Sequence, residues 1–468
     1  MPSTLLYLST AFVALTSITV KAALPSPIYG VNLGSWYVQV RGDALAYALQ
    51  ASSRSMDASP GYNLSFIIDT CSDCSACIAT EFAFAKAFPD TVDRKFNDHW
   101  NSWFNQEDVN DLVNVGINTV RIPLGYWIVE DLVDRSTEFY PRGGLKQLKR
   151  GLKQLRDANI AAILDHHALP GVQTPNQMFA GRCTTDVQFY TSHNYHRALI
   201  WTSVMTALSH IDPDFKAVTA IEAVNEPIMD ASQTPGYGDF QKHFVQVVRA
   251  TESALDMGNS FDLSASRNNL TTAMKLAASR NNFDDEVDAV LQDAMPILMR
   301  ILRQFGLDER VNNDEPLITA FMDINWQNNN PSNPADAKDG PQIYDNHLYY
   351  SFGGVADPNP DAYMRSICNL DRVQQDENLN NSPLVFGEWG LPTQFQADDD
   401  FLRQWADAQK LAYSKGDGWI FWNFKVEQSR QAGDLARQWS YLEGVRRGYL
   451  TRDPSDFNNP NVCDPFRN

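Results

Sequence analysis

Past its first residues, the chain alternates short apolar runs with longer amphipathic stretches. A nearly continuous apolar run is typical of a strand that is buried on both faces, as in a parallel sheet. Eight such runs predict strands over residues 29–33, 119–123, 161–165, 219–224, 317–322, 342–347, 384–388 and 418–422.

The stretches between these runs have helical periodicity. One apolar face is formed by Leu145, Leu148, Leu152 and Leu155, a second by Ile200, Val204 and Leu208, and a third, ended by Gly116, by Val109, Leu112 and Val113. Strands that alternate with helices favour an α/β fold with a parallel sheet, and eight strands favour a closed (β/α)8 TIM barrel over an open sheet.

Two segments are too long for ordinary loops of such a barrel. They cover residues 42–105 and 257–314, and the second contains a helical pattern over residues 294–302. Both follow predicted strands, so they belong to the βα loops of the catalytic face. Each insertion either walls a substrate cleft or decorates the outside of the barrel.

Residues 1–22 have the character of a secretory leader. The apolar stretch from Leu5 to Val20 is too short to span a bilayer, and Val20-Lys-Ala22 places small residues at the usual cleavage offsets. A buried first helix is the alternative, but Leu24-Pro-Ser-Pro27 would break it. No other segment reaches transmembrane length. We therefore expect a secreted protein, extracellular or in a cell wall, with a single catalytic domain over residues 23–468.

The cysteines and glycosylation sequons fit the same compartment. Six cysteines allow three disulfides, and Asn63-Leu-Ser65 and Asn269-Leu-Thr271 are acceptor sequons. The three-residue spacing of one cluster, Cys71, Cys74 and Cys77, could also indicate a metal or an iron–sulfur cluster. In an oxidising compartment, bridges from this cluster to the remaining cysteines, Cys183, Cys368 and Cys463, are favoured.

The charge of the chain excludes polyanionic partners. The formal net charge is −19, so nucleic acids and anionic membrane surfaces would be repelled. A neutral polymer would not be repelled, and the 11% of aromatic residues includes many flat Trp and Tyr rings that could stack on sugars. We expect a monomer without a membrane span in its mature form.

Two glutamates follow predicted strands. Glu226 stands in Ala223-Val-Asn-Glu-Pro227 and Glu388 in Val385-Phe-Gly-Glu-Trp-Gly390. In a barrel, residues at the carboxyl ends of different strands converge on one axis. Two carboxyls presented in this way are what glycoside hydrolysis needs, one to protonate the leaving oxygen and the other to attack or to activate water.

Other polar and aromatic side chains stand at the ends of the remaining strands. They are Arg121 on the second strand, His166 and His167 on the third, Asn225 on the fourth, His347 and Tyr349 on the sixth, and Trp422 on the eighth. Taken singly, each of these could be a structural hydrogen-bond partner or a core residue. No short spacing of metal ligands such as His-Glu-x-x-His occurs, so we predict neither a metal nor a cofactor.

The whole set resembles glycoside hydrolase family 5, the (β/α)8 retaining glycosidases that include fungal exo-β-1,3-glucanases and their endo-β-1,6-glucanase relatives. The resemblance runs from Gly30-Val-Asn-Leu-Gly-Ser-Trp36 to Lys425, interrupted by the two insertions. It implies a β-glucan substrate with β-1,3 or β-1,6 linkages. Cellulose, mannan or a glycolipid head group are alternatives within the same superfamily.

The resemblance also implies a role for each matching residue. Glu388 matches the nucleophile and Glu226 the acid/base, with Asn225 beside it on the sugar 2-hydroxyl. The other matching residues support these groups. The resemblance implies that Arg121 and Tyr349 hold Glu388 ionised and that His347 lies near Glu226. It also implies that His167 lies near the sugar and that Trp422 is the aromatic floor on which the sugar stacks. His166 has no clear counterpart, and we interpret it as structural.

The chain departs from the exo-glucanase pattern at its first strand. Those enzymes usually continue with Leu-Glu-Pro-Trp, where this chain has Gln39-Val-Arg-Gly42, and Phe424 replaces a family Trp. The missing glutamate puts exo-action on β-1,3-glucan in doubt. A catalytically silent wall-binding barrel would have no need of two costly carboxylates in one cleft. An inverting or metal-assisted hydrolase would need a wider carboxyl spacing, roughly 6.5–9.5 Å instead of about 5 Å, or a cluster of metal ligands.

Overall fold

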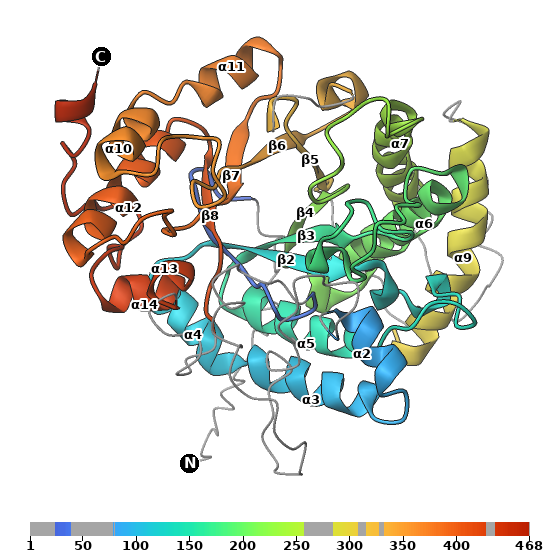
Figure 1. Cartoon of the computed structure of the whole chain (residues 1–468). Coiled ribbons are helices and arrows are strands. Elements are labelled where there is room, and N and C mark those ends of the chain that lie inside the picture. Colours follow the sequence, from blue (N-terminus) through green and yellow to red (C-terminus); the bar gives the residue numbers. More distant parts are fainter. Residues whose placement is uncertain are drawn as a thin grey trace, which may run out of the picture.

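Eight parallel strands close into one barrel in the computed structural model (Figure 1). The structure describes residues 24–38, 78, 80–256, 284–307, 315–326, 332–426 and 436–467. The strands follow one another around the barrel in sequence order: β1 Ile28–Asn32, β2 Thr119–Gly125, β3 Ala161–Ala168, β4 Val218–Glu222, β5 Ile318–Met322, β6 Gln342–His347, β7 Leu384–Glu388 and β8 Gly418–Phe421. The predicted (β/α)8 TIM barrel is confirmed, because every predicted strand overlaps an observed one.

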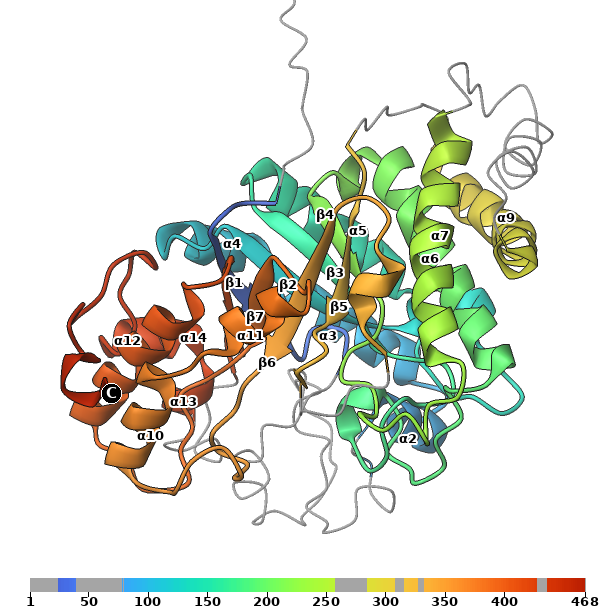
Figure 2. The same ribbon diagram turned by 90° about the horizontal axis from the view of Figure 1, so that it is seen from above.

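Helices surround the barrel (Figures 1 and 2). The described ones are α2 Glu81–Ala87, α3 Val92–Trp103, α4 Gln106–Asn114, α5 Gly144–Asp157, α6 Ser192–Ile211, α7 Tyr237–Asp256, α9 Asp285–Phe305, α10 Pro360–Cys368, α11 Arg372–Asn378, α12 Asp399–Tyr413, α13 Ala436–Trp439 and α14 Tyr441–Arg446. The third predicted helical face belongs to α4, which begins with a capping box of Asn105 and Asp108. Val109 and Leu112 are buried as predicted, but Val113 is 53% exposed and does not belong to the buried face. Gly116 follows it with φ +71°, a conformation that glycine adopts without strain.

Helix α6 is buried along almost its whole length, although its sequence indicated a single apolar face. Both α7 and α9 pack against it, and Figure 2 shows α9 outside this pair of helices. Helix α9 is the described part of the second insertion. It follows α7 and not β4, so the expectation that this insertion belongs to a βα loop is wrong for its described part. Helix α9 instead forms an outer layer beside the barrel helices, which is the decorating role.

The barrel interior is layered. Seven apolar side chains from seven strands form one cluster: Ile28, Ile163, Ala220, Ala320, Ile343, Val385 and Ile420. Further along the strands, the interior holds buried polar groups on β1 to β4 and β6, among them Asn32, Arg121, Asp165, Glu222 and Asp345. The apolar layer closes the barrel below, and the polar layer supports whatever lies at the carboxyl ends of the strands.

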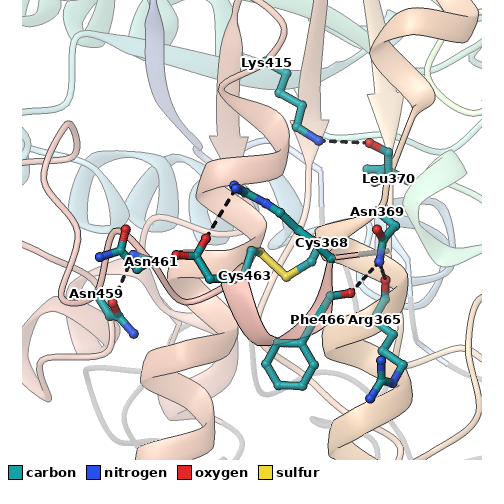
Figure 3. Close-up of a disulfide and its surroundings, with 11 residues drawn as sticks. Arg365, Cys368, Asn369, Leu370, Lys415, Asn459, Asn461, Cys463 and Phe466 are labelled. Atoms are coloured by element: carbon teal, nitrogen blue, oxygen red, sulfur yellow. Dashed lines mark hydrogen bonds and ion pairs between the residues drawn. A yellow bond between two sulfur atoms is a disulfide. The ribbon is translucent and has the colours of Figure 1, made fainter.

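A disulfide joins Cys368, the last residue of α10, to Cys463 near the end of the chain (Figure 3). Its Cα atoms are 5.3 Å apart, and Asn369 donates to the carbonyl of Phe466 next to it. The expectation that Cys368 and Cys463 bridge to the triple-cysteine cluster is therefore wrong for these two residues. Cys183 is also disulfide-bonded.

Several sequence-based expectations concern parts of the chain outside the described residues. These are the leader over residues 1–22, the cluster of Cys71, Cys74 and Cys77, and the sequons at Asn63 and Asn269. Among the helices that the structure describes, none is long and apolar enough to cross a membrane.

Candidate active site

The two glutamates meet at the carboxyl end of the barrel. Glu388 is the last residue of β7, and His347 beside it is the last residue of β6. Glu226 lies four residues beyond the end of β4, not at the end of the strand as the sequence indicated, and its φ is +42°. A glutamate rarely adopts this left-handed backbone conformation. Strained backbone conformations of this kind cluster at functional sites.

Glu388 is held by two fixed donors. Nη1 of Arg121 donates to Oε1 at 2.9 Å, and the hydroxyl of Tyr349 donates to Oε2 at 2.9 Å. Burial raises the pKa of Glu388 above its ordinary value, while His347 and Arg121 act in the opposite direction. Burial also raises the pKa of Tyr349 well above 10, so its hydroxyl remains a donor. Both oxygens of Glu388 are therefore oriented.

Glu226 is the more accessible of the pair. Its side chain is 20% exposed, against 7% for Glu388. Oε1 of Glu226 lies 2.8 Å from Nδ1 of His347, which is itself 3.6 Å from Oε2 of Glu388. Burial alone would lower the pKa of His347, but Glu388 and Asp345 outweigh it and raise the pKa well above 6.5. A charged imidazole thus stands between the two carboxyls.

One oxygen of Glu226, one oxygen of Glu388 and a ring nitrogen of His347 all lie within 4.8 Å of one another. Among the described residues, this is the one group of three such side chains that could surround a cation. Arg121 already places a fixed positive charge 2.9 Å from Glu388, which disfavours a second cation. We therefore interpret the three side chains as a carboxyl pair and the histidine that lies between them.

Arg121 lies within β2, since this strand extends to Gly125, and not at its end as the sequence indicated. Besides Glu388, its guanidinium reaches three buried acids that the sequence analysis missed. They are Glu222, 2.8 Å from Nε, Asp165, 3.1 Å from Nη1, and Asp345, 3.6 Å from Nε. The sequence did contain a signal for these acids, since each is an isolated acidic residue within or directly after an apolar run. A buried charge there would be very costly without a partner, so each acid indicates a buried cation nearby.

This cluster holds more carboxyls than cations. Burial raises the pKa of Asp165 to about 7 and that of Glu222 to about 8, although Arg121 lowers both. Four acids around one guanidinium in a dry interior cannot all be ionised at low cost. In acid, Asp165 and Glu222 are therefore protonated, and the positive charge of Arg121 pairs with the acids that remain ionised.

The histidines of β3 differ in their surroundings. His167 has Nδ1 2.6 Å from Oδ2 of Asp165, and no described residue bonds its Nε2. Burial lowers the pKa of His167 to about 3, so its ring is neutral. His166 is fully buried and stacks on Trp201 with ring centroids 4.0 Å apart. Its contacts agree with the structural interpretation.

Asn225 and Trp422 complete the set. Arg121 donates from Nη2 to Oδ1 of Asn225 at 2.9 Å, which orients the amide. Trp422 directly follows β8, is 4% exposed and lies nearly parallel to the ring of His167, with centroids 5.8 Å apart. The structure thus brings all eight candidate residues from the sequence to one end of the barrel.

Three known proteins are similar to this chain in sequence or in fold. The chain is 29% identical over 451 residues to glucan endo-1,6-beta-glucosidase B of Emericella nidulans, covering 94% of this chain and 89% of that protein. It is 23% identical to a probable glucan 1,3-beta-glucosidase A of Neosartorya fischeri, with 78% of each chain covered. The crystal structure of rutinosidase from Aspergillus niger shares the fold, with a TM-score of 0.56, 15% identity, and coverage of 92% of this chain and 99% of that one.

A family model assigns the chain to a protein family. The model "Cellulase (glycosyl hydrolase family 5)" matches residues 85–428, which is well over half of the 468 residues. This range includes both glutamates and each of the candidate residues around them. The chain is therefore a glycoside hydrolase that belongs to family 5.

Proposed function

We propose that this protein hydrolyses β-linked glucan by double displacement, with retention of the anomeric configuration. The observation that carries the proposal is the approach of Glu226 and Glu388, which place one carboxyl oxygen each within 4.8 Å of the other. Retaining enzymes separate the two carboxyl groups by about 5–5.5 Å, whereas inverting enzymes leave room for a water molecule at roughly 6.5–9.5 Å.

Glu388 is the proposed nucleophile. It attacks the anomeric carbon, and the glycosidic bond breaks as the covalent glycosyl-enzyme forms. Arg121 and Tyr349 bond its two oxygens at 2.9 Å each, so the carboxylate is oriented before substrate arrives. The positive charge of Arg121 and the hydrogen bond from Tyr349 favour the ionised form of Glu388, against the effect of burial.

Glu226 is the proposed acid and base. In the first step it gives its proton to the departing glycosidic oxygen, and in the second it takes a proton from the water that releases the sugar from Glu388. Its side chain is 20% exposed and so is within reach of water. His347, 2.8 Å away, holds the carboxyl in place.

Three residues are proposed to bind the sugar. Arg121 occupies the oxygen of the Asn225 amide, which leaves the NH₂ group to donate to the 2-hydroxyl. Neutral His167, held at Nδ1 by Asp165, has Nε2 for a further hydroxyl. Trp422 supplies an aromatic face at the same end of the barrel.

The favoured linkage is β-1,6, with endo-action. Identity to the endo-1,6-glucosidase from Emericella nidulans is 29% over 94% of the chain, against 23% for the 1,3-glucosidase of Neosartorya fischeri. The replacement of the exo-glucanase glutamate by the Gln39–Gly42 segment agrees with this choice. We further propose that the protein acts outside the cell, in cell-wall metabolism, because the Cys368–Cys463 disulfide suits an oxidising compartment.

A panel of polysaccharides tests the proposal. Purified protein is incubated with pustulan (β-1,6), laminarin (β-1,3), cellulose and mannan, and the products are separated by length. Pustulan should be cut to a ladder of oligosaccharides, and proton NMR of fresh products should show the β-anomer first. Initial release of the α-anomer would overturn the retaining mechanism, and cleavage of mannan or cellulose alone would overturn the substrate.

A further inference from the structure

The β6–β7 ladder is irregular next to the proposed nucleophile. Asp345 pairs with Val385, and the next pair is His347 with Glu388, so the chain advances two residues along β6 but three along β7. This is the pattern of a β-bulge, which adds a residue to one strand and re-aims the side chains beyond it. The irregularity brings His347 and Glu388 opposite each other at the strand ends.

The side chain of Asp345 occupies this irregularity. Its Oδ1 accepts a hydrogen bond of 2.7 Å from the backbone N–H of Gly387, the residue before Glu388. A Cβ atom on Gly387 would lie 2.1–2.3 Å from the carboxyl of Asp345. Glycine is therefore required at residue 387 for the carboxylate to approach, and the approach gives a buried N–H group its partner.

The second oxygen of Asp345 faces the other half of the site. Oδ2 lies 3.5 Å from Nε2 of His347 and 3.6 Å from Nε of Arg121. These are ion-pair distances rather than short hydrogen bonds. His347 bonds Glu226 through its other nitrogen, and Arg121 bonds Glu388. The Asp345 carboxylate is thus connected to each catalytic glutamate through one intervening residue, His347 for Glu226 and Arg121 for Glu388.

We propose that Asp345 is a positioning residue that sets Glu226 and Glu388 relative to each other, through His347 on one side and the Gly387 backbone on the other. The inference rests on the proposed function, since it concerns the same reaction. Asp345 acts through Gly387, His347 and Arg121, which are the neighbours that it contacts. Asp165 and Glu222 also pair with Arg121, but Asp345 alone among the described acids contacts both Gly387 and His347.

The charge on His347 is the measurable part of this arrangement. The titratable groups that face it are Asp345 on its own strand, Glu226 after β4, Glu388 on β7, and Asp165 and His167 on β3. Of these, Glu388, Asp345 and Glu226 favour the protonated imidazole. Loss of the Asp345 charge should therefore lower the pKa of His347 without removing either catalytic carboxyl.

Asp345→Asn tests the proposal, because asparagine keeps an oxygen for Gly387 and loses the charge. We expect kcat to fall about 10- to 100-fold, the range typical of groups that orient a reactive residue through one intermediary, with little change in KM. The basic limb of the kcat/KM profile should move to lower pH. Asp407→Asn is the matched control, since Asp407 on α12 is equally buried but accepts hydrogen bonds from the backbone N–H groups of Asn458 and Asn459.

Titration by NMR separates this inference from the proposed function. The imidazole signals of His347 are identified by their absence from His347→Gln and followed against pH in wild type and Asp345→Asn. A lower titration midpoint in Asp345→Asn supports the positioning role even if no β-glucan is cleaved, an outcome that would overturn only the proposed substrate. An unchanged midpoint and an unchanged pH profile would overturn the positioning role, whatever happens to kcat.

Discussion

Arg121 lies 2.9 Å from Glu388 and 2.8 Å from Glu222, so one buried guanidinium serves both the proposed nucleophile and the barrel interior. A cation in this place has two consequences. It orients a reacting group, and it compensates acids that would otherwise be buried without a partner. Substitutions that separate charge from geometry should therefore affect stability and turnover differently.

Arg121→Ala should destabilise the fold by roughly 3–5 kcal/mol, because it leaves buried acids without their cation. Arg121→Lys keeps the charge but loses the planar fork that now reaches Asn32, Asn225 and Glu388 together. The lysine variant should retain most of the stability and lose most of the activity. Urea unfolding and kcat check this pair, and equal stability of wild type and the alanine variant would contradict the role of Arg121.

Stability should decrease as the pH rises towards 8. The folded-state pKa values of Asp165, about 7, and Glu222, about 8, are raised above the ordinary values of about 3.9 and 4.3. Acids with raised folded pKa values bind protons more tightly when folded. Their contribution is fully present below about pH 4, declines as the pH rises, and is lost once the folded pKa values are passed.

The measurement is the melting temperature of wild type and Glu222→Gln across this pH range. Glutamine mimics the protonated acid at every pH, so the variant should lose less stability than wild type between pH 5 and pH 8. Parallel curves for the two proteins would show that Glu222 does not titrate as described.

The barrel could be predicted from sequence because its strands are buried on both faces. Each strand therefore reads as an apolar run, and β6 and β7 begin and end where the pattern indicated. Candidate residues at the strand ends followed from topology, since parallel strands present their carboxyl ends together. The positions of Arg121 within β2 and of Glu226 beyond β4 show that strand ends are less certain than strands.

The support for the site could not be predicted in the same way. Asp345 acts through an irregularity between β6 and β7, and one sequence shows neither the register of two strands nor a bulge in it. The Cys368–Cys463 bridge joins residues 95 positions apart, and periodicity carries no information on such pairings. These features depend on tertiary contacts alone.

Phe352 should contribute to the binding of polymer and not to folding. Its side chain is 58% exposed, and its ring lies 5.6 Å from that of Tyr349, which donates to Glu388. An exposed ring so near the nucleophile offers a face for a neighbouring glucose unit, worth about 0.5–1.5 kcal/mol. Phe352→Ala should raise KM for pustulan about 2- to 10-fold and leave the melting temperature unchanged.

A short aryl glucoside is the internal comparison, because it does not extend to Phe352. Val113→Ala on α4 is the control for removing an exposed apolar side chain elsewhere, since Val113 is 53% exposed. If Phe352→Ala affected polymer and aryl glucoside equally, Phe352 would act on Tyr349 and the reaction instead of on substrate binding.

Substitution of the two glutamates should separate their roles. Glu388→Gln should abolish turnover of every substrate, because no glycosyl-enzyme forms without the nucleophile. Glu226→Gln should still form the glycosyl-enzyme rapidly from a dinitrophenyl glucoside, whose leaving group needs no proton, but not from pustulan. Azide should restore the second step in Glu226→Gln alone, since a small anion needs no general base and the 20% exposed side chain at residue 226 leaves it an approach. The product, a β-glycosyl azide, is identified by mass spectrometry and NMR. Formation of a β-glycosyl azide by Glu388→Gln, or identical responses of the two variants to leaving group and azide, would reverse or remove the assignment of nucleophile and acid.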